Sequence, residues 1–212
     1  MAFGMNVQSR PRATEDPSEL VGRPLRDVAA LAKSWNFEDA GIGMAAVNAY
    51  HSHPVRALAH GFRPCADNNW ARTFHPYAPL VAGKRVAVIG HFPFAAAAMP
   101  DAAQLTILER NVLDGDYPDS ACEYLLPDMD YVFISGSAFV NKTMPRLLAL
   151  AADAHTVVLG PSAPASPAIL AAGATTVMSF ASAHPARLED GLAGRTLQGM
   201  YDAGMRVELS RP

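Results

Sequence analysis

Small and polar residues stand at the ends of four apolar stretches in the second half of the chain. Each stretch has the composition of a buried parallel strand, so the residues after it are expected at one edge of a sheet. In open α/β sheets, ligands bind outside the carboxyl ends of the strands, where the strand order reverses. The four groups are Gly90, His91, Phe92, Pro93 and Phe94; Glu109, Arg110 and Asn111; Ser135, Gly136 and Ser137, followed by Asn141 and Thr143; and Gly160, Pro161, Ser162, Ala163 and Pro164. Together they predict a site for a small ligand.

Glu109 lies 19 residues after Gly90, at the end of the second predicted strand. An acidic residue at this spacing accepts hydrogen bonds from ribose hydroxyls in dinucleotide sites. The loop after the first strand reads GHFPF, however, and lacks the glycines that let a pyrophosphate approach the backbone. A standard NAD site is therefore not favoured, whereas a nucleoside-type ligand without a pyrophosphate fits. The alternative is that Glu109 is a surface carboxylate or an ion-pair partner of Arg110.

The third and fourth strand ends offer hydroxyl and amide groups. Asn141 is expected either to cap the helix that follows it or to help that helix start hold an anion. Ser162 stands between two prolines, which predicts a stiff loop and a fixed hydrogen-bond donor. The sequence shows no His–Asp pair that would activate Ser162 as a nucleophile.

Histidines suggest a metal in two places. The first is a cluster within 25 residues, formed by His51, His53, His60, Cys65 and His75, but its spacing matches no compact zinc motif, and such residues are more often ordinary surface groups. His91 differs because it stands on the loop after the first strand. His91 is therefore the candidate metal ligand or general acid/base.

Five predicted strands alternate with helices and position these residues. The strands are expected over 84–92, 105–111, 130–138, 155–163 and 174–180, and the helices over 94–103, 118–128, 141–154, 166–173 and 186–204. Short loops and regular alternation predict a Rossmann-like three-layer α/β domain, with a mainly parallel sheet and helices on both faces.

The N-terminal part has a different pattern. Residues 1–18 are polar and predict a flexible leader. An amphipathic helix is expected over 19–35, and a second helix opens at Asp39 or Gly41. Residues 51–82 are expected to form an irregular connection that can include a short strand or helix. The predicted organisation is thus a small, mostly helical N-terminal domain over 19–81 and the Rossmann-like domain over 82–212.

The composition excludes several classes of protein. The chain has 212 residues, half of them hydrophobic, and a formal net charge of −3 without any run of Lys or Arg. Neither a nucleic acid nor an anionic membrane is expected as a partner. Two distant cysteines and the absence of a signal-like apolar stretch in the first residues predict a cytoplasmic protein.

In this order, the segments IGHFPF, LERN, DYPDSACEYLLPDMDYVFISGSAFVNKT and VVLGPSAPASP resemble the "putative heavy-metal chelation" family. The upstream segment AGIGMAAVNAY resembles the small N-terminal domain of that family, which is similar to the N-terminal domain of enolases, although few residues precede it here. The resemblance covers about residues 38–180. It implies a truncated N-terminal domain, a Rossmann-like domain and a ligand in the cleft between them. The site residues it implies are Asn48, Gly90, His91, Phe92, Pro93, Phe94, Glu109, Ser135, Gly136, Ser137, Asn141, Thr143, Gly160, Pro161, Ser162 and Pro164.

Three functions fit these observations. The first is a small-ligand-binding protein that handles a metal, a metal complex or a chelator precursor, with a transition metal or a nucleoside-type molecule as bound group. The second is an enzyme that uses a nucleoside-containing cofactor such as S-adenosylmethionine or a nucleotide, with His91 and Asn48 as candidate catalytic residues. The third is a non-catalytic interaction module. The helix over 19–35 is the predicted interface of a homo-oligomer.

Overall fold

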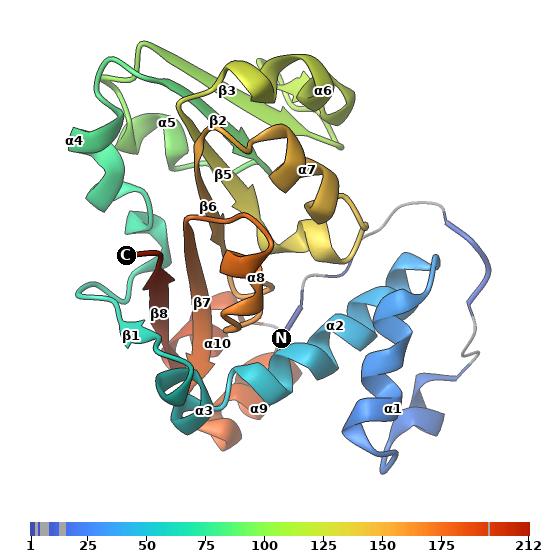
Figure 1. The fold of residues 1–212 in the computed structure, drawn as a ribbon. Coiled ribbons are helices and arrows are strands. Elements are labelled where there is room, and N and C mark those ends of the chain that lie inside the picture. The colour runs from blue at the N-terminus through green and yellow to red at the C-terminus, as the bar shows by residue number, and fades with distance from the viewer. Residues whose placement is uncertain (3, 5–8, 13–15, 195) are drawn as a thin grey trace.

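The computed structural model describes residues 1–212 except 3, 5–8, 13–15 and 195. Within this described part, eight strands form one sheet in the order β1-β8-β7-β6-β5-β2-β3-β4 (Figure 1). The strands are β1 Arg63–Pro64, β2 Arg85–Ile89, β3 Gln104–Glu109, β4 Tyr117–Pro118, β5 Tyr131–Ser135, β6 His155–Leu159, β7 Thr176–Ser182 and β8 Gly204–Ser210. The mainly parallel α/β fold is therefore confirmed.

The strand order reverses at β2. The chain passes from β2 to β3 on one side and then crosses to β5 on the other, and all strands from β2 to β7 pair in parallel. The carboxyl ends of β2 and β5 therefore flank the point at which such sheets bind ligands. At the opposite end of the sheet, β8 runs antiparallel to β7, and β1 antiparallel to β8.

Helices cover both faces of the sheet (Figure 1). Their bounds are α1 Leu25–Ala29, α2 Phe37–His51, α3 Pro54–Ala59, α4 Ala78–Val81, α5 Ala95–Ala98, α6 Cys122–Leu125, α7 Met144–Leu150, α8 Ala168–Ala171, α9 Pro185–Ala193 and α10 Leu197–Asp202. Residues of α3, α6, α7 and α8 join one apolar cluster with the sheet, and residues of α4 and α5 join another on the opposite face. No helix among the described residues is long and apolar enough to cross a membrane.

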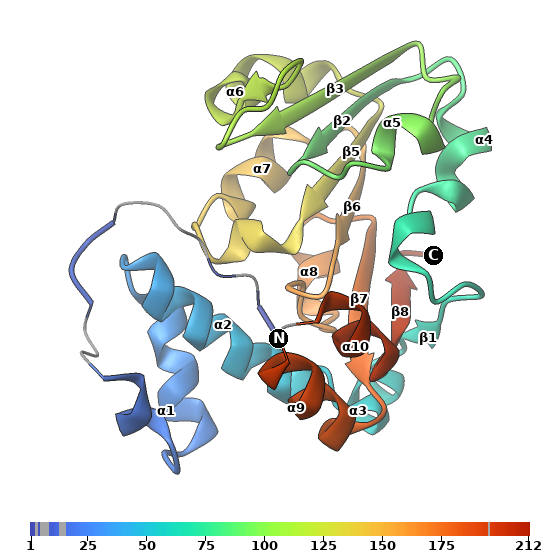
Figure 2. The same cartoon turned by 180° about the vertical axis from the view of Figure 1, so that it is seen from behind.

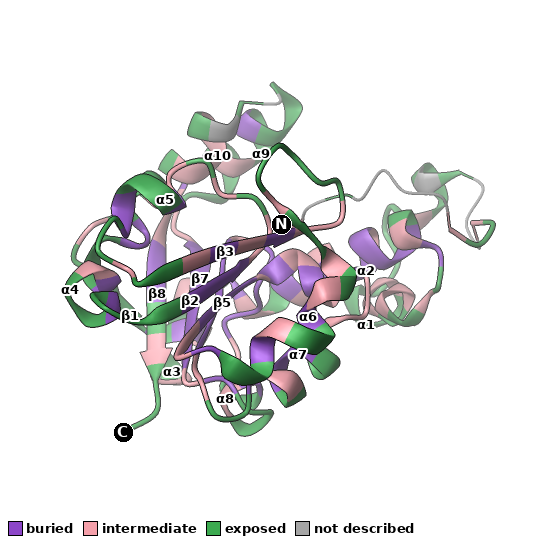
Figure 3. Cartoon of the chain, turned by 90° about the horizontal axis from the view of Figure 1, so that it is seen from above, coloured by how far each residue is buried: buried purple, intermediate pink, exposed green. Residues whose placement is uncertain are grey.

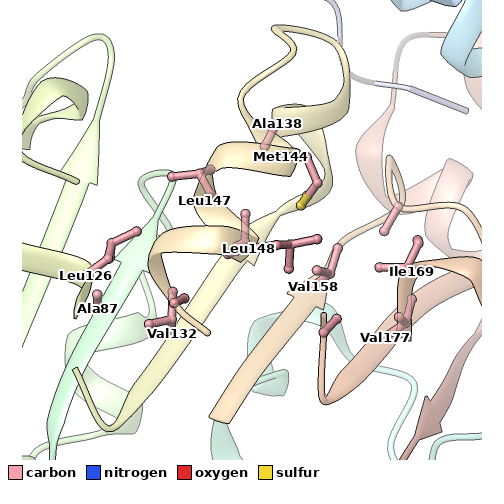
Figure 4. Packing of buried hydrophobic residues seen from close by; sticks show 14 of the residues in the cluster. Ala87, Leu126, Val132, Ala138, Met144, Leu147, Leu148, Val158, Ile169 and Val177 are labelled. Carbon is pink, nitrogen blue, oxygen red and sulfur yellow. The ribbon is translucent and has the colours of Figure 1, made fainter. Parts of the chain in front are cut away.

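The two apolar clusters explain why the central strands are apolar throughout. On one face, Leu147 and Leu148 of α7 pack near Val132 and Val158 (Figure 4). On the other face, the Phe133 ring meets the Phe74 ring edge-on at a centroid distance of 5.1 Å. Figure 3 shows β2, β5 and β7 largely buried, whereas the surrounding helices carry exposed surfaces. A parallel sheet covered on both faces requires such runs of apolar residues.

The N-terminal helices pack against each other beside the sheet domain. Asn36 caps α2, because its side-chain oxygen accepts hydrogen bonds from the backbone N–H groups of Glu38 and Asp39. A Cβ at Gly43 would lie 1.9 Å from the Ala32 nitrogen, so only glycine lets α2 approach the turn after α1 so closely. α1 and the start of α2 project away from the sheet in Figures 1 and 2.

The largest differences between the prediction and the structure lie towards the two ends of the chain. The single helix expected over 19–35 is divided into two 3-10 turns and α1, because Gly22 adopts a φ of 80° and Pro24 precedes α1. The helical region expected over 186–204 consists of α9 and α10, and the strand β8 after it is missing from the sequence-based prediction. α10 lies against the sheet near β8 in Figure 2.

Candidate functional site

A cavity of about 480 Å³ opens at the carboxyl ends of β2, β3, β5 and β6. We call it the main cavity. Its lining residues are Gly4, Gly90, His91, Phe92, Glu109, Asn111, Leu113, Ser135, Ser137, Gly160, Pro161, Ser162 and Tyr201. Nine of the sequence-predicted site residues are in this set, and they come from all four strand ends. The main cavity therefore lies at the edge where the sequence predicted a ligand.

Glycines bring the strand ends close together. Gly90 and Gly160 end β2 and β6 with φ values of 106° and 112°, a region that other residues rarely adopt. A Cβ at Gly90 would lie 3.0 Å from the Ser135 Cβ at the end of β5. The three strand ends therefore form one continuous wall.

His91 forms a pair with Asp116 at the mouth of the main cavity. The Nδ1 atom of His91 lies 2.9 Å from Asp116 Oδ2, and the Asp116 side chain is only 3% exposed. The same carboxylate accepts a hydrogen bond from the Leu113 N–H at 3.2 Å. Because a carboxylate only accepts, Nδ1 carries the hydrogen and Nε2 is left as the basic nitrogen. This arrangement suits a metal ligand or a proton acceptor.

The sequence reading missed this His–Asp pair. The two residues are 25 positions apart in the sequence. The pair favours His91 as the chemically active side chain and gives no support to Ser162 as a nucleophile. Asp116 also lies in a loop without periodicity, so only the fold brings it to His91.

Carboxylate and hydroxyl groups line the inner wall of the main cavity. Glu109 lies at the end of β3, and its Oε1 atom accepts from the Asn111 N–H at 3.4 Å. The Ser137 hydroxyl donates to the Ser135 hydroxyl oxygen at 2.9 Å. Glu109 is not the partner of Arg110, whose Nε atom pairs instead with Asp119 at 2.8 Å. The Glu109 carboxylate thus faces a space lined by small polar groups.

A side pocket of about 80 Å³ adjoins the main cavity beyond Glu109. Asn141 and Thr143 lie there together with Cys122. The Asn141 side-chain oxygen accepts hydrogen bonds from the Thr143 hydroxyl at 2.6 Å and from the Thr143 N–H at 3.2 Å. Asn141 therefore stabilises the turn just before α7, but it does not cap this helix, because Thr143 occupies the N-cap position and no side chain caps α7. Burial raises the pKa of the Cys122 thiol to about 11, so this group stays protonated.

Five predicted site residues lie outside both pockets. Asn48 is fully buried in α2 and donates hydrogen bonds to the carbonyl oxygens of Ser162, at 2.9 Å, and Met1, at 2.6 Å. It supports the loop over 160–165, which we call the cavity loop. The other four are Gly136 and Pro164, which are buried, Phe94, which packs on Phe74, and Pro93, which is exposed.

Four residues of the main cavity were not among the site residues implied by the family resemblance: Gly4, Asn111, Leu113 and Tyr201, of which Asn111 had been named only as a strand-end residue. Asn111 ends the strand predicted over 105–111 and Leu113 comes two residues later, so their position at this strand end was the available signal. Tyr201 belongs to α10, and its ring lies 5.8 Å from the Trp70 ring. No spacing in the sequence connects Tyr201 with the strand ends.

A resident metal ion does not fit the side chains of the main cavity. Among the described residues, no group of three or more His, Cys, Asp or Glu side chains could hold an ion. The histidine cluster noted in the sequence does not form such a group either. His53 and His75 are exposed, whereas the centroids of the His51 and His60 rings lie 5.8 Å apart. His91 and Glu109 are the metal-binding side-chain types in the main cavity lining.

Comparisons with known proteins agree with the fold. A family model described as "Putative heavy-metal chelation" (DUF364) matches residues 74–203, and a second model with the same description (DUF4213) matches residues 3–51. A crystal structure of a protein of unknown function from the DUF364 family of Desulfitobacterium hafniense DCB-2 is 37% identical, with a TM-score of 0.84, and the match covers 95% of this chain and 82% of that one. A second such protein, from Pyrococcus horikoshii, is 21% identical over 97% of this chain and 80% of that one, with a TM-score of 0.77, and shows the fold alone. No curated protein matches.

Proposed function

Because this chain belongs to the family described as "putative heavy-metal chelation" (DUF364), we propose that its main cavity binds an organic chelator or a metal ion already held by one. In this proposal the metal complex is the cargo or substrate, and the protein does not provide a complete set of ligands for a bare ion. The observation that carries this proposal is the His91–Asp116 pair at the mouth of a cavity without a three-residue ligand group among the described side chains.

The size of the main cavity supports a small molecule as ligand. Its volume of about 480 Å³ falls within the range of about 300–1,000 Å³ that is typical of small-molecule sites. A metal complex brings most of its donor atoms with it. The neutral Nε2 atom of His91 can then fill one open position of the ion, while Asp116 fixes the ring.

The charge of the wall also restricts the ligand. The described residues that line the main cavity include Glu109 but no Lys or Arg. Dense anions such as a pyrophosphate need cations or free backbone N–H groups. The part of the ligand that meets Glu109 is therefore expected to be cationic or to offer O–H or N–H donors, as the water molecules at the open positions of a metal complex do.

A second candidate function is an enzyme that uses a nucleoside cofactor without phosphates, such as S-adenosylmethionine. It is favoured by the position of Glu109, which lines the main cavity at the end of β3 beside the Gly90 turn. In related folds a carboxylate at this place binds ribose hydroxyls. The His91–Asp116 pair would then serve as the general base.

The two candidates are separated by ligand titrations of untagged protein. We expect Ni²⁺–nitrilotriacetate, which leaves open positions on the metal, to bind measurably by calorimetry. The His91→Ala variant should bind at least about tenfold more weakly, equivalent to about 1.4 kcal/mol. The exposed His75→Ala variant is the matched control and should bind like the unmodified chain.

Two results would contradict the chelate proposal. One is Ni²⁺–nitrilotriacetate binding that is unchanged in His91→Ala, and the other is binding of bare Ni²⁺ that depends on His91. A thermal shift with S-adenosylmethionine that disappears in Glu109→Gln would support the cofactor candidate instead, since a ligand at 100 times its Kd adds about 2.7 kcal/mol to stability.

A further inference from the structure

Two histidine rings meet behind the cavity loop, away from the main cavity lining. His51 is the last residue of α2, and His60 follows α3 directly. Their ring centroids lie 5.8 Å apart with an interplanar angle of 50°. Both side chains are half-buried, so part of each residue faces the solvent.

A backbone carbonyl lies between the two rings. The Nδ1 atom of His60 lies 3.4 Å from the Ala165 oxygen, which is long for a hydrogen bond. The Nδ1 atom of His51 is buried and has no hydrogen-bond partner, although the Ala165 carbonyl is close enough to favour its protonated form. The Nδ1 atoms of both rings therefore lie near the Ala165 oxygen, and none of the three atoms makes a short hydrogen bond to another.

The surroundings of His51 favour the neutral form of its ring. Burial, the His60 ring and the Arg56 guanidinium together hold the pKa of His51 below its ordinary value, and the Ala165 carbonyl acts in the opposite direction. The Arg56 side chain is itself engaged, because it donates to the Tyr50 carbonyl at 2.9 Å and lies 3.5 Å from the centre of the Tyr50 ring. A neutral imidazole offers the lone pair that a transition metal needs.

We propose that His51, His60 and the Ala165 carbonyl bind one divalent transition-metal ion, such as Cu²⁺ or Zn²⁺, at a site separate from the main cavity. With metal–nitrogen bonds of about 2.0–2.1 Å, two imidazoles on one ion place their ring centroids about 5–6 Å apart. The observed separation of 5.8 Å falls in this range. Imidazole ligands suit copper, zinc and nickel, and water completes the coordination.

The position of this site connects it to the cavity loop. His51 lies three residues after Asn48 on α2, so both side chains face the same side of the helix. Asn48 already holds the Ser162 carbonyl, and the ion binds the Ala165 carbonyl three residues further along the loop. An ion at this site therefore joins α2 and α3 to the segment that forms one wall of the main cavity.

Cu²⁺ binding to the untagged full chain tests the proposal, because electron paramagnetic resonance counts the nitrogens that bind the ion. We expect one Cu²⁺ per chain with the pattern of two imidazole nitrogens. His51→Ala and His60→Ala should each weaken binding at least tenfold and leave one nitrogen. His53→Ala is the matched control, since His53 is exposed two residues after His51, and it should bind like the unmodified chain.

The spectrum of the unmodified chain decides the question even if a variant folds poorly, and circular dichroism checks the folding of each variant. A spectrum without two imidazole nitrogens overturns the proposal, as does binding that is unchanged in both His51→Ala and His60→Ala. Loss of the ion in His91→Ala would also overturn it, because the ion would then belong to the main cavity. Failure of Ni²⁺–nitrilotriacetate to bind bears only on the proposed function.

Discussion

Gly136 offers the most direct test of how the main cavity is built. It follows the end of β5, and a Cβ at this position would lie 2.3 Å from the Ala163 nitrogen and 2.7 Å from the Ser162 carbonyl carbon. Both atoms belong to the backbone of the cavity loop, so no flexible side chain can move aside. We therefore expect Gly136→Ala to push the cavity loop away from the end of β5.

The expected loss of stability follows from the contact. The backbone of Gly136 does not adopt a positive φ, so alanine is allowed there and the cost is steric. Overpacking a core costs about 1–3 kcal/mol, and we expect the upper end because backbone atoms collide. For a chain of this length, 1 kcal/mol lowers the Tm by about 2–4 °C, which gives a decrease of about 6–12 °C.

Thermal unfolding followed by circular dichroism measures this decrease, and titration with Ni²⁺–nitrilotriacetate measures the effect on the main cavity. Gly83→Ala is the matched control, because its Cβ would meet no atom within 4 Å and only its φ of 70° causes strain. Gly83 lies before β2, away from the cavity lining, so this variant should keep its ligand affinity. A Tm of Gly136→Ala within about 2 °C of the unmodified chain would refute the steric argument.

Three further outcomes follow from buried groups. Asn48→Ala removes a buried amide that donates to the Ser162 carbonyl at 2.9 Å, so the free energy of unfolding in urea should fall by about 1–3 kcal/mol. Burial lowers the pKa of His155, so at falling pH the unfolded chain binds a proton here before the folded chain does. The Tm should therefore fall as the pH drops from 7.5 to 5, and it should fall less in the His155→Gln variant. Burial raises the pKa of Cys65 and of Cys122 from 9.0 to about 11, so the reactive thiolate is scarce at pH 8. Both thiols should therefore react about 100-fold more slowly with Ellman's reagent at pH 8 than a thiol of pKa 9 does, and unfolding the chain should remove this difference.

The five central parallel strands could be predicted because their physical requirement is local. A strand covered on both faces must be apolar over its whole length, and the segments over 84–92, 130–138 and 155–163 have this pattern. Glycine at the end of a strand marks the turn, as the positive φ of Gly90 and Gly160 shows. The alternation with helices then leaves a doubly covered parallel sheet as the simplest architecture.

The strand β8 could not be predicted in the same way. It lies near the edge of the sheet and alternates apolar with polar residues, so it lacks the continuous apolar run of the central strands. It also contains Arg206, whose buried guanidinium donates to the Asn69 carbonyl. Pairing with β7 and contacts with the distant segment around Asn69 help to stabilise a charged residue at this place.

The candidate site likewise contains residues that could be predicted from the sequence and residues that could not. The residues that directly follow strands were predictable, because parallel strands place their carboxyl ends at one edge. The partner of His91 was not, since Asp116 reaches it from a loop 25 residues further along the chain. Asn48 was assigned to the ligand site through the family resemblance, whereas in the structure its amide donates a hydrogen bond to the Ser162 carbonyl of the cavity loop.

The cavity loop is held from three directions, and this has a consequence for binding. Asn48 holds the Ser162 carbonyl from α2, the Ser179 hydroxyl donates to the Ala163 carbonyl at 2.5 Å from β7, and Gly136 packs against the same two loop residues from β5. A wall fixed in this way needs little ordering when a ligand binds, so less of the interaction energy is lost as conformational entropy. We therefore expect the supporting residues to affect ligand affinity without touching the ligand. Substitutions behind the loop should change affinity through the position of Pro161 and Ser162, whereas substitutions of His91 or Glu109 should change which ligand is bound.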